Sequence, residues 1–99
     1  MIVSVHPANG TIATVLGTVS TNIDSYQSEI KYIFVKSESS DTVFDVTFTD
    51  IFNNVIFQRL DITGELNEQM DLPGYGNLTM TIENATKDED FNYVVGIIK

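Results

Sequence analysis

The chain has 99 residues, of which 42% are hydrophobic, and its formal net charge is −9. This length fits one domain with its own core, and the acidic charge argues against binding to nucleic acid or to an anionic membrane surface. The absence of cysteine excludes a disulfide framework and a thiolate metal site, and no run of about 18 apolar residues predicts a transmembrane helix.

The first ten residues are expected either to fold with the domain or to form an N-terminal arm. Ile2–Val5 has the composition of a short edge strand. His6-Pro7 and Asn9-Gly10 are expected to interrupt it, because proline lacks an amide donor and Asn-Gly favours a tight turn.

A β-strand is predicted over Thr11–Val19, where threonine and other β-branched residues are frequent. Gly17 inside this stretch is expected to mark a bulge or a close backbone approach. The polar segment Ser20–Gln27 is predicted to be a loop.

The segment Glu29–Lys36 is predicted to be a strand with apolar side chains on both faces. Strict alternation assigns its residues to two sets, Ile30, Tyr32 and Phe34 on one face and Ile33 and Val35 on the other. A strand that is apolar on both sides is typical of a central strand whose second face is partly covered.

The middle of the chain predicts a β-hairpin. The segment Thr42–Thr49 alternates cleanly and directs three apolar side chains toward the core, Phe44, Val46 and Phe48. Asn53-Asn54 supplies a turn, and Val55–Ile62 is the returning strand.

The segment Glu65–Leu72 is ambiguous between helix and strand. Leu66 and Met70 lie four apart, which suits one helical turn, but they also share one strand face on which Glu68 is the exception. Its neighbours are strands and Pro73-Gly74 ends it, so we favour a strand.

The last quarter is predicted to be an antiparallel hairpin. Its first strand alternates apolar and polar residues, with Leu78, Met80 and Ile82 on the apolar face. A polar connection over Asn84–Asp90 leads to a second strand over Phe91–Ile98. Together these elements predict an all-β fold in a single domain (residues 1–99), an antiparallel β-sandwich of seven or eight strands that is immunoglobulin-like or a jelly roll.

No motif predicts catalysis. His6 is the only histidine and stands near a chain end, and no G-x-S-x-G sequence occurs. A zinc site would need three or four Cys, His or carboxylate ligands and is not expected. We therefore predict that the protein is not an enzyme and has no catalytic residue, metal site or cofactor.

Two groups of acidic residues are candidate sites. Asp88-Glu89-Asp90 offers hard oxygen ligands for Ca²⁺ but lacks the D-x-D-x-D-G spacing, so we expect a solvated loop. A second group could supply a glycosidase pair but is expected to be ordinary surface charge: Asp61, Glu65, Glu68 and Asp71.

A glycan-binding module would need exposed aromatic side chains, and the chain has no tryptophan. Tyr26, Tyr75 and Tyr93 are the candidates, although each is expected more often in a core or at its rim. The two N-x-T sequences, at Asn77 and Asn84, carry no prediction of glycosylation.

A candidate protein interface arises from two strands that are apolar on both sides. The last strand carries Val94 and Ile98 on the face opposite its main apolar face, and Ile33 and Val35 occupy the corresponding face of Glu29–Lys36. If these strands share a sheet, the four side chains would form an apolar patch of the kind that contacts partners. Coverage by Ile2–Val5 or a loop is the alternative.

The C-terminal half, from FDVTFTD at Phe44 to the ending GNLTMTIENAT and its terminal strand, resembles small virion structural proteins of tailed bacteriophages. These are β-sandwich capsid decoration or cement proteins and head accessories. The resemblance implies a non-enzymatic homo-oligomer on the outer capsid surface of a virion, bound to the major capsid protein or to head or neck proteins. The alternative is a glycan- or peptide-binding sandwich module of an adhesin or fibre.

Overall fold

The computed structural model describes residues 5–24, 29–73, 77–86 and 88–98. Eight strands make up the fold, β1 (Val5–Ala13), β2 (Val19–Asp24), β3 (Glu29–Ser37), β4 (Val43–Thr49), β5 (Val55–Thr63), β6 (Glu65–Pro73), β7 (Asn77–Glu83) and β8 (Asp90–Ile98). No helix in this part of the chain is long and apolar enough to cross a membrane.

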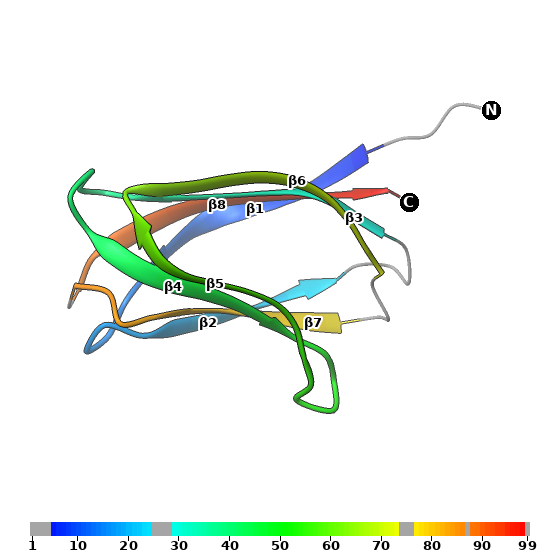
Figure 1. The fold of residues 1–99 in the computed structure, drawn as a ribbon, viewed down its shortest axis with the longest axis horizontal. Helices are drawn as coiled ribbons and strands as arrows, with labels where there is room; N and C mark the ends of the chain where they lie inside the picture. Colours follow the sequence, from blue (N-terminus) through cyan, green and yellow to red (C-terminus); the bar gives the residue numbers. More distant parts are fainter. Residues whose placement is uncertain (1–4, 25–28, 74–76, 87, 99) are drawn as a thin grey trace.

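The strands form two four-stranded antiparallel sheets that face each other (Figure 1). Their orders are β1-β8-β3-β6 and β2-β7-β4-β5, so each strand lies in the opposite sheet from the one before it, except for β5 after β4. This is the arrangement of a jelly roll rather than of an immunoglobulin domain. The predicted β-sandwich is confirmed.

Strand β1 runs through the residues that were expected to interrupt it. It pairs with β8 without a break from Val5 opposite Ile98 to Ala13 opposite Asp90. Pro7 is tolerated because β1 is an edge strand, where a missing amide donor need not remove a ladder hydrogen bond. Residues 5–10 therefore belong to the sheet, and the rest of the expected arm lies outside the described residues.

The first turn falls inside the predicted strand over 11–19. Val15 and Thr18 exchange backbone hydrogen bonds of 3.0 and 3.2 Å, and Gly17 has a φ of +86°, so Gly17 belongs to a turn rather than a bulge. The alternative, a close backbone approach, is confirmed, because an added Cβ at Gly17 would lie 2.5 Å from the Ala85 carbonyl oxygen. The predicted loop over 20–27 is also corrected, because β2 occupies its first part. Ile23 of β2 is buried, whereas Ser20 and Asn22 face outward, which explains the polar composition.

Strand β3 contains a bulge that reverses its alternation. Its register shifts between Ile30 and Tyr32 against both neighbouring strands. A single inserted residue moves every later side chain to the other face. Ile33 and Val35 are therefore fully buried, and Tyr32 lies on the outer face.

Strands β7 and β8 do not form the predicted hairpin. β7 pairs with β2 and β4, whereas β8 pairs with β1 and β3 in the other sheet. Their connection crosses the sandwich, whose sheets pack about 10 Å apart. The predicted β4–β5 hairpin is confirmed, as is the strand assignment of β6.

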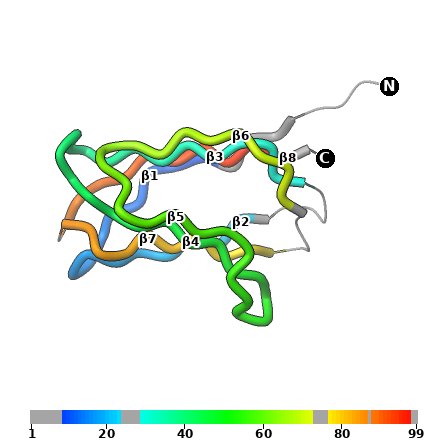
Figure 2. Tube along the Cα trace, in the orientation of Figure 1, coloured from blue at the N-terminus to red at the C-terminus, as the bar shows by residue number. Residues whose placement is uncertain are grey.

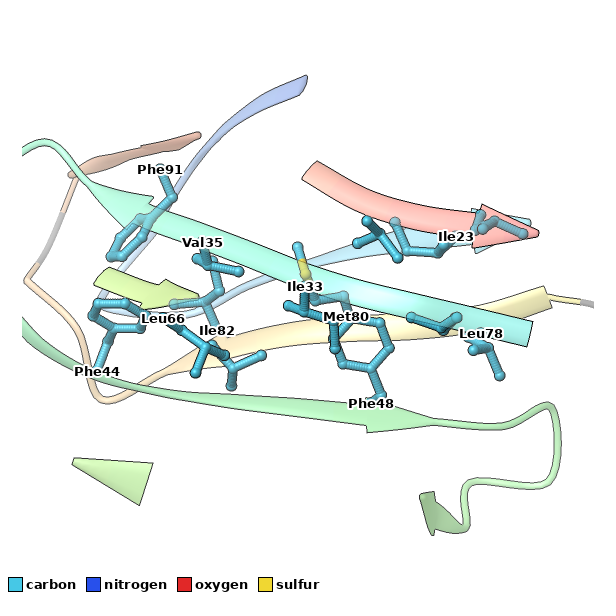
Figure 3. Packing of buried hydrophobic residues seen from close by; sticks show 14 residues of the cluster. Ile23, Ile33, Val35, Phe44, Phe48, Leu66, Leu78, Met80, Ile82 and Phe91 are labelled. Carbon is cyan, nitrogen blue, oxygen red and sulfur yellow. The ribbon is translucent and has the colours of Figure 1, made fainter. Parts of the chain in front are cut away.

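The core lies between the sheets and contains side chains from both (Figure 3). The inward residues of β4 are those predicted by alternation, Phe44, Val46 and Phe48. Phe44 of β4 meets Phe91 of β8 edge to face, with ring centroids 5.0 Å apart, so an aromatic pair joins the two sheets.

Gly64 is the single residue between β5 and β6, which belong to opposite sheets. Its φ is +78°, its N–H donates to the Thr42 carbonyl at 2.8 Å, and an added Cβ would lie 2.7 Å from the Ser40 carbonyl oxygen. We expect Gly64→Ala to lower the free energy of unfolding by at least about 1–2 kcal/mol, the cost of a left-handed backbone with a side chain. Urea denaturation measures this loss.

The matched control is Gly10→Ala. Gly10 lies in β1 and has no positive φ, and the three atoms nearest to an added Cβ, at 3.2–3.4 Å, all belong to the side chain of Tyr93, which can shift more easily than backbone. Equal unfolding midpoints for the two variants would contradict the strained turn at Gly64.

Candidate functional site

Only part of the apolar patch that the sequence predicts lies on the surface of the protein. Ile33 and Val35 are fully buried in the core, so their assignment to an exposed patch is wrong, and the cause is the bulge in β3. Val94 does lie on the outer face of its sheet, half-buried, between Asn9 of β1 and Phe34 of β3. The side chain of Ile98 lies outside the described residues.

The outer face of the sheet β1-β8-β3-β6 instead carries two aromatic side chains. Tyr32 lies opposite Gly96, and its ring occupies the space that a Cβ at position 96 would fill. Phe34 lies opposite Val94 in the next row. Both aromatic side chains are half-buried, so they line the sheet surface while keeping part of each ring in contact with solvent.

A hollow of about 440 Å³ opens beside Tyr32 at the edge of this face, and we call it the aromatic hollow. Its lining residues come from β3 and β6: Lys31, Tyr32, Gln69, Met70 and Asp71. The ammonium group of Lys31 pairs with the carboxylates of Asp71 and, at 3.0 Å, of Glu29. Hydrogen bonds to Asp71 and Glu29 raise the pKa of Lys31 above its usual value, so the ion pair at the rim remains charged.

Two members of the predicted acidic group on β5 and β6 belong to separate ion pairs. Glu68 binds Arg59 at 2.6 Å, and Asp71 binds Lys31. Glu65 and Asp71 are six residues apart on one strand, a separation of about 20 Å in extended backbone. The arrangement therefore does not place these two carboxylates as a glycosidase pair.

The predicted acidic loop is not uniformly solvated. Glu89 is buried, with Thr42 Oγ1 within 2.6 and 2.7 Å of its two carboxylate oxygens and the Ser39 N–H donating to Oε1 at 3.1 Å. Burial alone would raise its pKa, but hydrogen bonds from Thr42, Ser39 and Thr86 outweigh burial and hold the pKa below the ordinary value. Its carboxylate thus accepts hydrogen bonds that join the β7–β8 connection to the β3–β4 connection.

No group of three or more His, Cys, Asp or Glu residues within the described ranges is placed to hold a metal ion. His6 belongs to β1, but its side chain lies outside the described residues. Of the three tyrosines considered for a glycan platform, Tyr93 packs against the core, and Tyr26 and Tyr75 lie outside the described residues.

The turn between β4 and β5 displays large apolar side chains to solvent. Ile51, Phe52 and Val55 are 64%, 78% and 58% exposed, and we call these three residues the apolar hairpin tip. Figure 2 shows this turn, in green, projecting beyond the rest of the sandwich.

Asp50 holds the turn in a fixed shape. Its Oδ1 accepts hydrogen bonds from the N–H groups of Phe52 at 2.8 Å and Asn54 at 2.9 Å. The hydrogen bonds from Asn54, chiefly, and from Phe52 hold the pKa of Asp50 below its ordinary value. The apolar hairpin tip is therefore presented by an ordered turn rather than by a loose loop.

Both surfaces were missed from the sequence alone. The signal for the hairpin tip was present, because two large apolar residues stand within the turn sequence DIFNN. Alternation without the bulge predicts that Tyr32 and Phe34 lie in the core, so the aromatic hollow could not be predicted from the sequence.

No family model matches the sequence, and no curated protein matches it. Among solved structures, the chain is similar to the Yersinia pseudotuberculosis-derived mitogen, with a TM-score of 0.57 and 13% identity over 97% of this chain and 87% of that one. It is also similar to PirA, with a TM-score of 0.51 and 11% identity over 91% of this chain and 92% of that one.

A third similar structure is the VP2 subviral particle of infectious bursal disease virus, with a TM-score of 0.47 and 14% identity. That match covers 93% of this chain but 33% of the VP2 chain, so this protein spans about a third of its length. At such identities the comparisons show the fold alone. The fold defines the protein as a small, all-β sandwich domain.

Proposed function

We propose that this protein is a non-enzymatic structural protein of a bacteriophage virion, a capsid decoration or cement subunit that acts through protein–protein contacts. The observation that carries the proposal is the apolar hairpin tip, whose side chains an ordered turn keeps exposed to solvent. The small sandwich fold and the net charge of −9, which favours solubility on a crowded particle, support it.

The hairpin tip has the properties of an anchor for a protein pocket. Phe52 and Ile51 are mostly exposed, and burying each side chain in a partner would contribute about 1.5–3 kcal/mol. Asp50 already orders the turn, so little conformational entropy is lost on docking. Aromatic residues, phenylalanine included, are enriched at the cores of interfaces, where a few buried residues carry most of the binding energy.

The partner of the hairpin tip is a shell protein, either the major capsid protein or a head or neck protein. The residues next to the tip in sequence, 49–57, are uncharged apart from Asp50, so we infer a matching apolar pocket whose rim is neutral or basic. Association of several copies on the outer capsid surface, as a homo-oligomer, would multiply a modest contact by avidity.

We expect Phe52→Asp to abolish or strongly weaken binding to the shell without changing the fold, because the side chain is 78% exposed. The measurement is co-sedimentation of the purified protein with shells assembled from the capsid protein of the same phage genome. Circular dichroism and thermal denaturation report the fold of the variant.

The matched control is Leu16→Asp. Leu16 is also 78% exposed, and it lies in the β1–β2 turn at the other end of the sandwich (Figure 1). Binding by Leu16→Asp but not by Phe52→Asp supports the proposal. Absence of wild-type co-sedimentation, or equal binding by both variants, contradicts it.

A further inference from the structure

The aromatic hollow is separate from the hairpin tip. It lies on the outer face of the sheet β1-β8-β3-β6, whereas the tip belongs to the β4–β5 hairpin of the other sheet. We propose that the aromatic hollow is a binding site for a neutral glycan, a function that does not depend on the role proposed for the hairpin tip.

The ring of Tyr32 packs directly over Gly96, which has no side chain to displace it. The ring covers Gly96, which is buried although it points outward from the sheet. Any larger residue at position 96 would displace the ring. One side of the ring is thereby packed on β8, and the ring lines the hollow.

Phe34 extends the apolar surface along β3. It stands two residues from Tyr32 on the same face, a spacing of about 6.5–7 Å in a strand. Two neighbouring rings on one face of a sheet can contact the C–H faces of successive sugar rings. Such contacts resemble other aromatic packing, which contributes about 0.5–1.5 kcal/mol per pair beyond burial.

Hydrogen-bonding groups surround the rings on the same face. Register places four exposed amide side chains around them, Asn9, Asn67, Gln69 and Asn92. Each amide offers both donors and acceptors, as sugar hydroxyls require. Gln69 lies directly opposite Tyr32 and also lines the hollow.

The charges at the rim select against an acidic ligand. Glu29 and Asp71 form ion pairs with Lys31, so its positive charge is already neutralised within the protein. The whole chain carries a net charge of −9. A phosphate, sulfate or uronic acid would meet this negative field. The hollow of about 440 Å³ lies within the range of about 300–1,000 Å³ typical of small-ligand sites.

The test is a titration of the ¹⁵N-labelled protein, at millimolar ligand, with neutral tetrasaccharides of glucose, galactose, mannose and N-acetylglucosamine. A galacturonic acid tetrasaccharide is the charged counterpart. We expect at least one neutral saccharide to shift the backbone amides of Gln69 and Gly96. Tyr32→Ala is expected to weaken its binding about tenfold or more, as the loss of one stacking contact and its buried area implies.

Gln69→Ala tests the site without disturbing the ring, and Gln58→Ala is its matched control. Both glutamines are exposed and lie on edge strands, Gln69 on β6 and Gln58 on β5 of the other sheet. Weaker binding in Gln69→Ala with unchanged binding in Gln58→Ala supports the proposal. It is overturned if no neutral saccharide shifts these amides, if only the acidic saccharide does, or if an apolar peptide binds there and no saccharide does.

Discussion

Replacing Phe44 with alanine is expected to lower the free energy of unfolding by about 3–5 kcal/mol, the usual cost of removing a buried aromatic side chain. Phe44 is fully buried and packs edge to face on Phe91 of the opposite sheet. Its removal would open a cavity where the two sheets are joined. Because a domain is stable by only about 5–15 kcal/mol, urea denaturation followed by far-UV circular dichroism should show a large shift in midpoint.

Val43→Ala is the control for this loss. Val43 is the adjacent residue of β4, points outward and is 47% exposed, so its substitution should cost less than about 1 kcal/mol. If the two variants unfold at the same urea concentration, the assignment of Phe44 to the core is incorrect.

Alternation in the sequence located the regular strands β4 and β7, because it depends only on which face is buried. β4 and β7 were found with their inward residues, Phe44 and Leu78 among them. Pairing could not be derived in the same way. The residues between β7 and β8 are compatible with either a hairpin or a crossing between sheets, and the choice depends on contacts with β2, β4, β1 and β3 that are distant in sequence.

The predictions for β1 and β2 were wrong because the local preferences of their residues are overridden by the position of each strand in its sheet. Pro7 and Asn9-Gly10 favour turns in isolation, but pairing of β1 with β8 overrides that preference. β2 is polar because Ser20 and Asn22 face solvent, where Ser20 Oγ lies 3.0 Å from the hydroxyl of Thr81. A half-exposed strand of this kind has the composition of a loop.

The bulge in β3 had the largest effect on the candidate site. Alternation was correct on each side of Lys31, but a single inserted residue exchanged the two faces. Ile33 and Val35 moved from the expected interface to the core, and Tyr32 and Phe34 moved to the surface. The expectation that the outer face of β3 and β8 is apolar holds with Val94 as predicted, but with Tyr32 and Phe34 in place of Ile33 and Val35.

The two proposed surfaces are compatible in one molecule. The apolar hairpin tip belongs to one sheet, and the aromatic hollow lies on the outer face of the other. A subunit docked on a shell through its hairpin tip could therefore keep its aromatic face free. Each proposal is tested by its own variants, so Phe52→Asp should leave saccharide binding intact and Tyr32→Ala should leave shell binding intact.

The pH dependence of stability should depend on Glu89. Its folded-state pKa lies below the ordinary value of 4.5, so the ionised carboxylate stabilises the fold fully above the unfolded-state pKa. This contribution is lost as the pH falls through the lower, folded-state pKa. Glu89→Gln removes the proton-binding group, and the difference in stability between wild type and variant should therefore shrink in acid.

At neutral pH we expect Glu89→Gln to lower the free energy of unfolding by about 1–3 kcal/mol, because an amide NH₂ would replace one acceptor oxygen and leave a buried donor unsatisfied. The donors at risk are the Thr42 hydroxyl and the Ser39 N–H. Glu89 belongs to the β7–β8 connection and both donors to the β3–β4 connection, so the variant should also loosen that end of the sandwich, measurable as faster amide hydrogen exchange at Ser39.

Asp88→Asn separates this effect from a general loss of negative charge. Asp88 is the adjacent acid, is exposed, and has a φ of +54°, which asparagine also tolerates. Its replacement should leave both the neutral-pH stability and the acid dependence close to those of the wild type. If Asp88→Asn flattens the pH profile as much as Glu89→Gln does, the acid sensitivity comes from the overall charge of −9 rather than from the buried carboxylate that joins the loops.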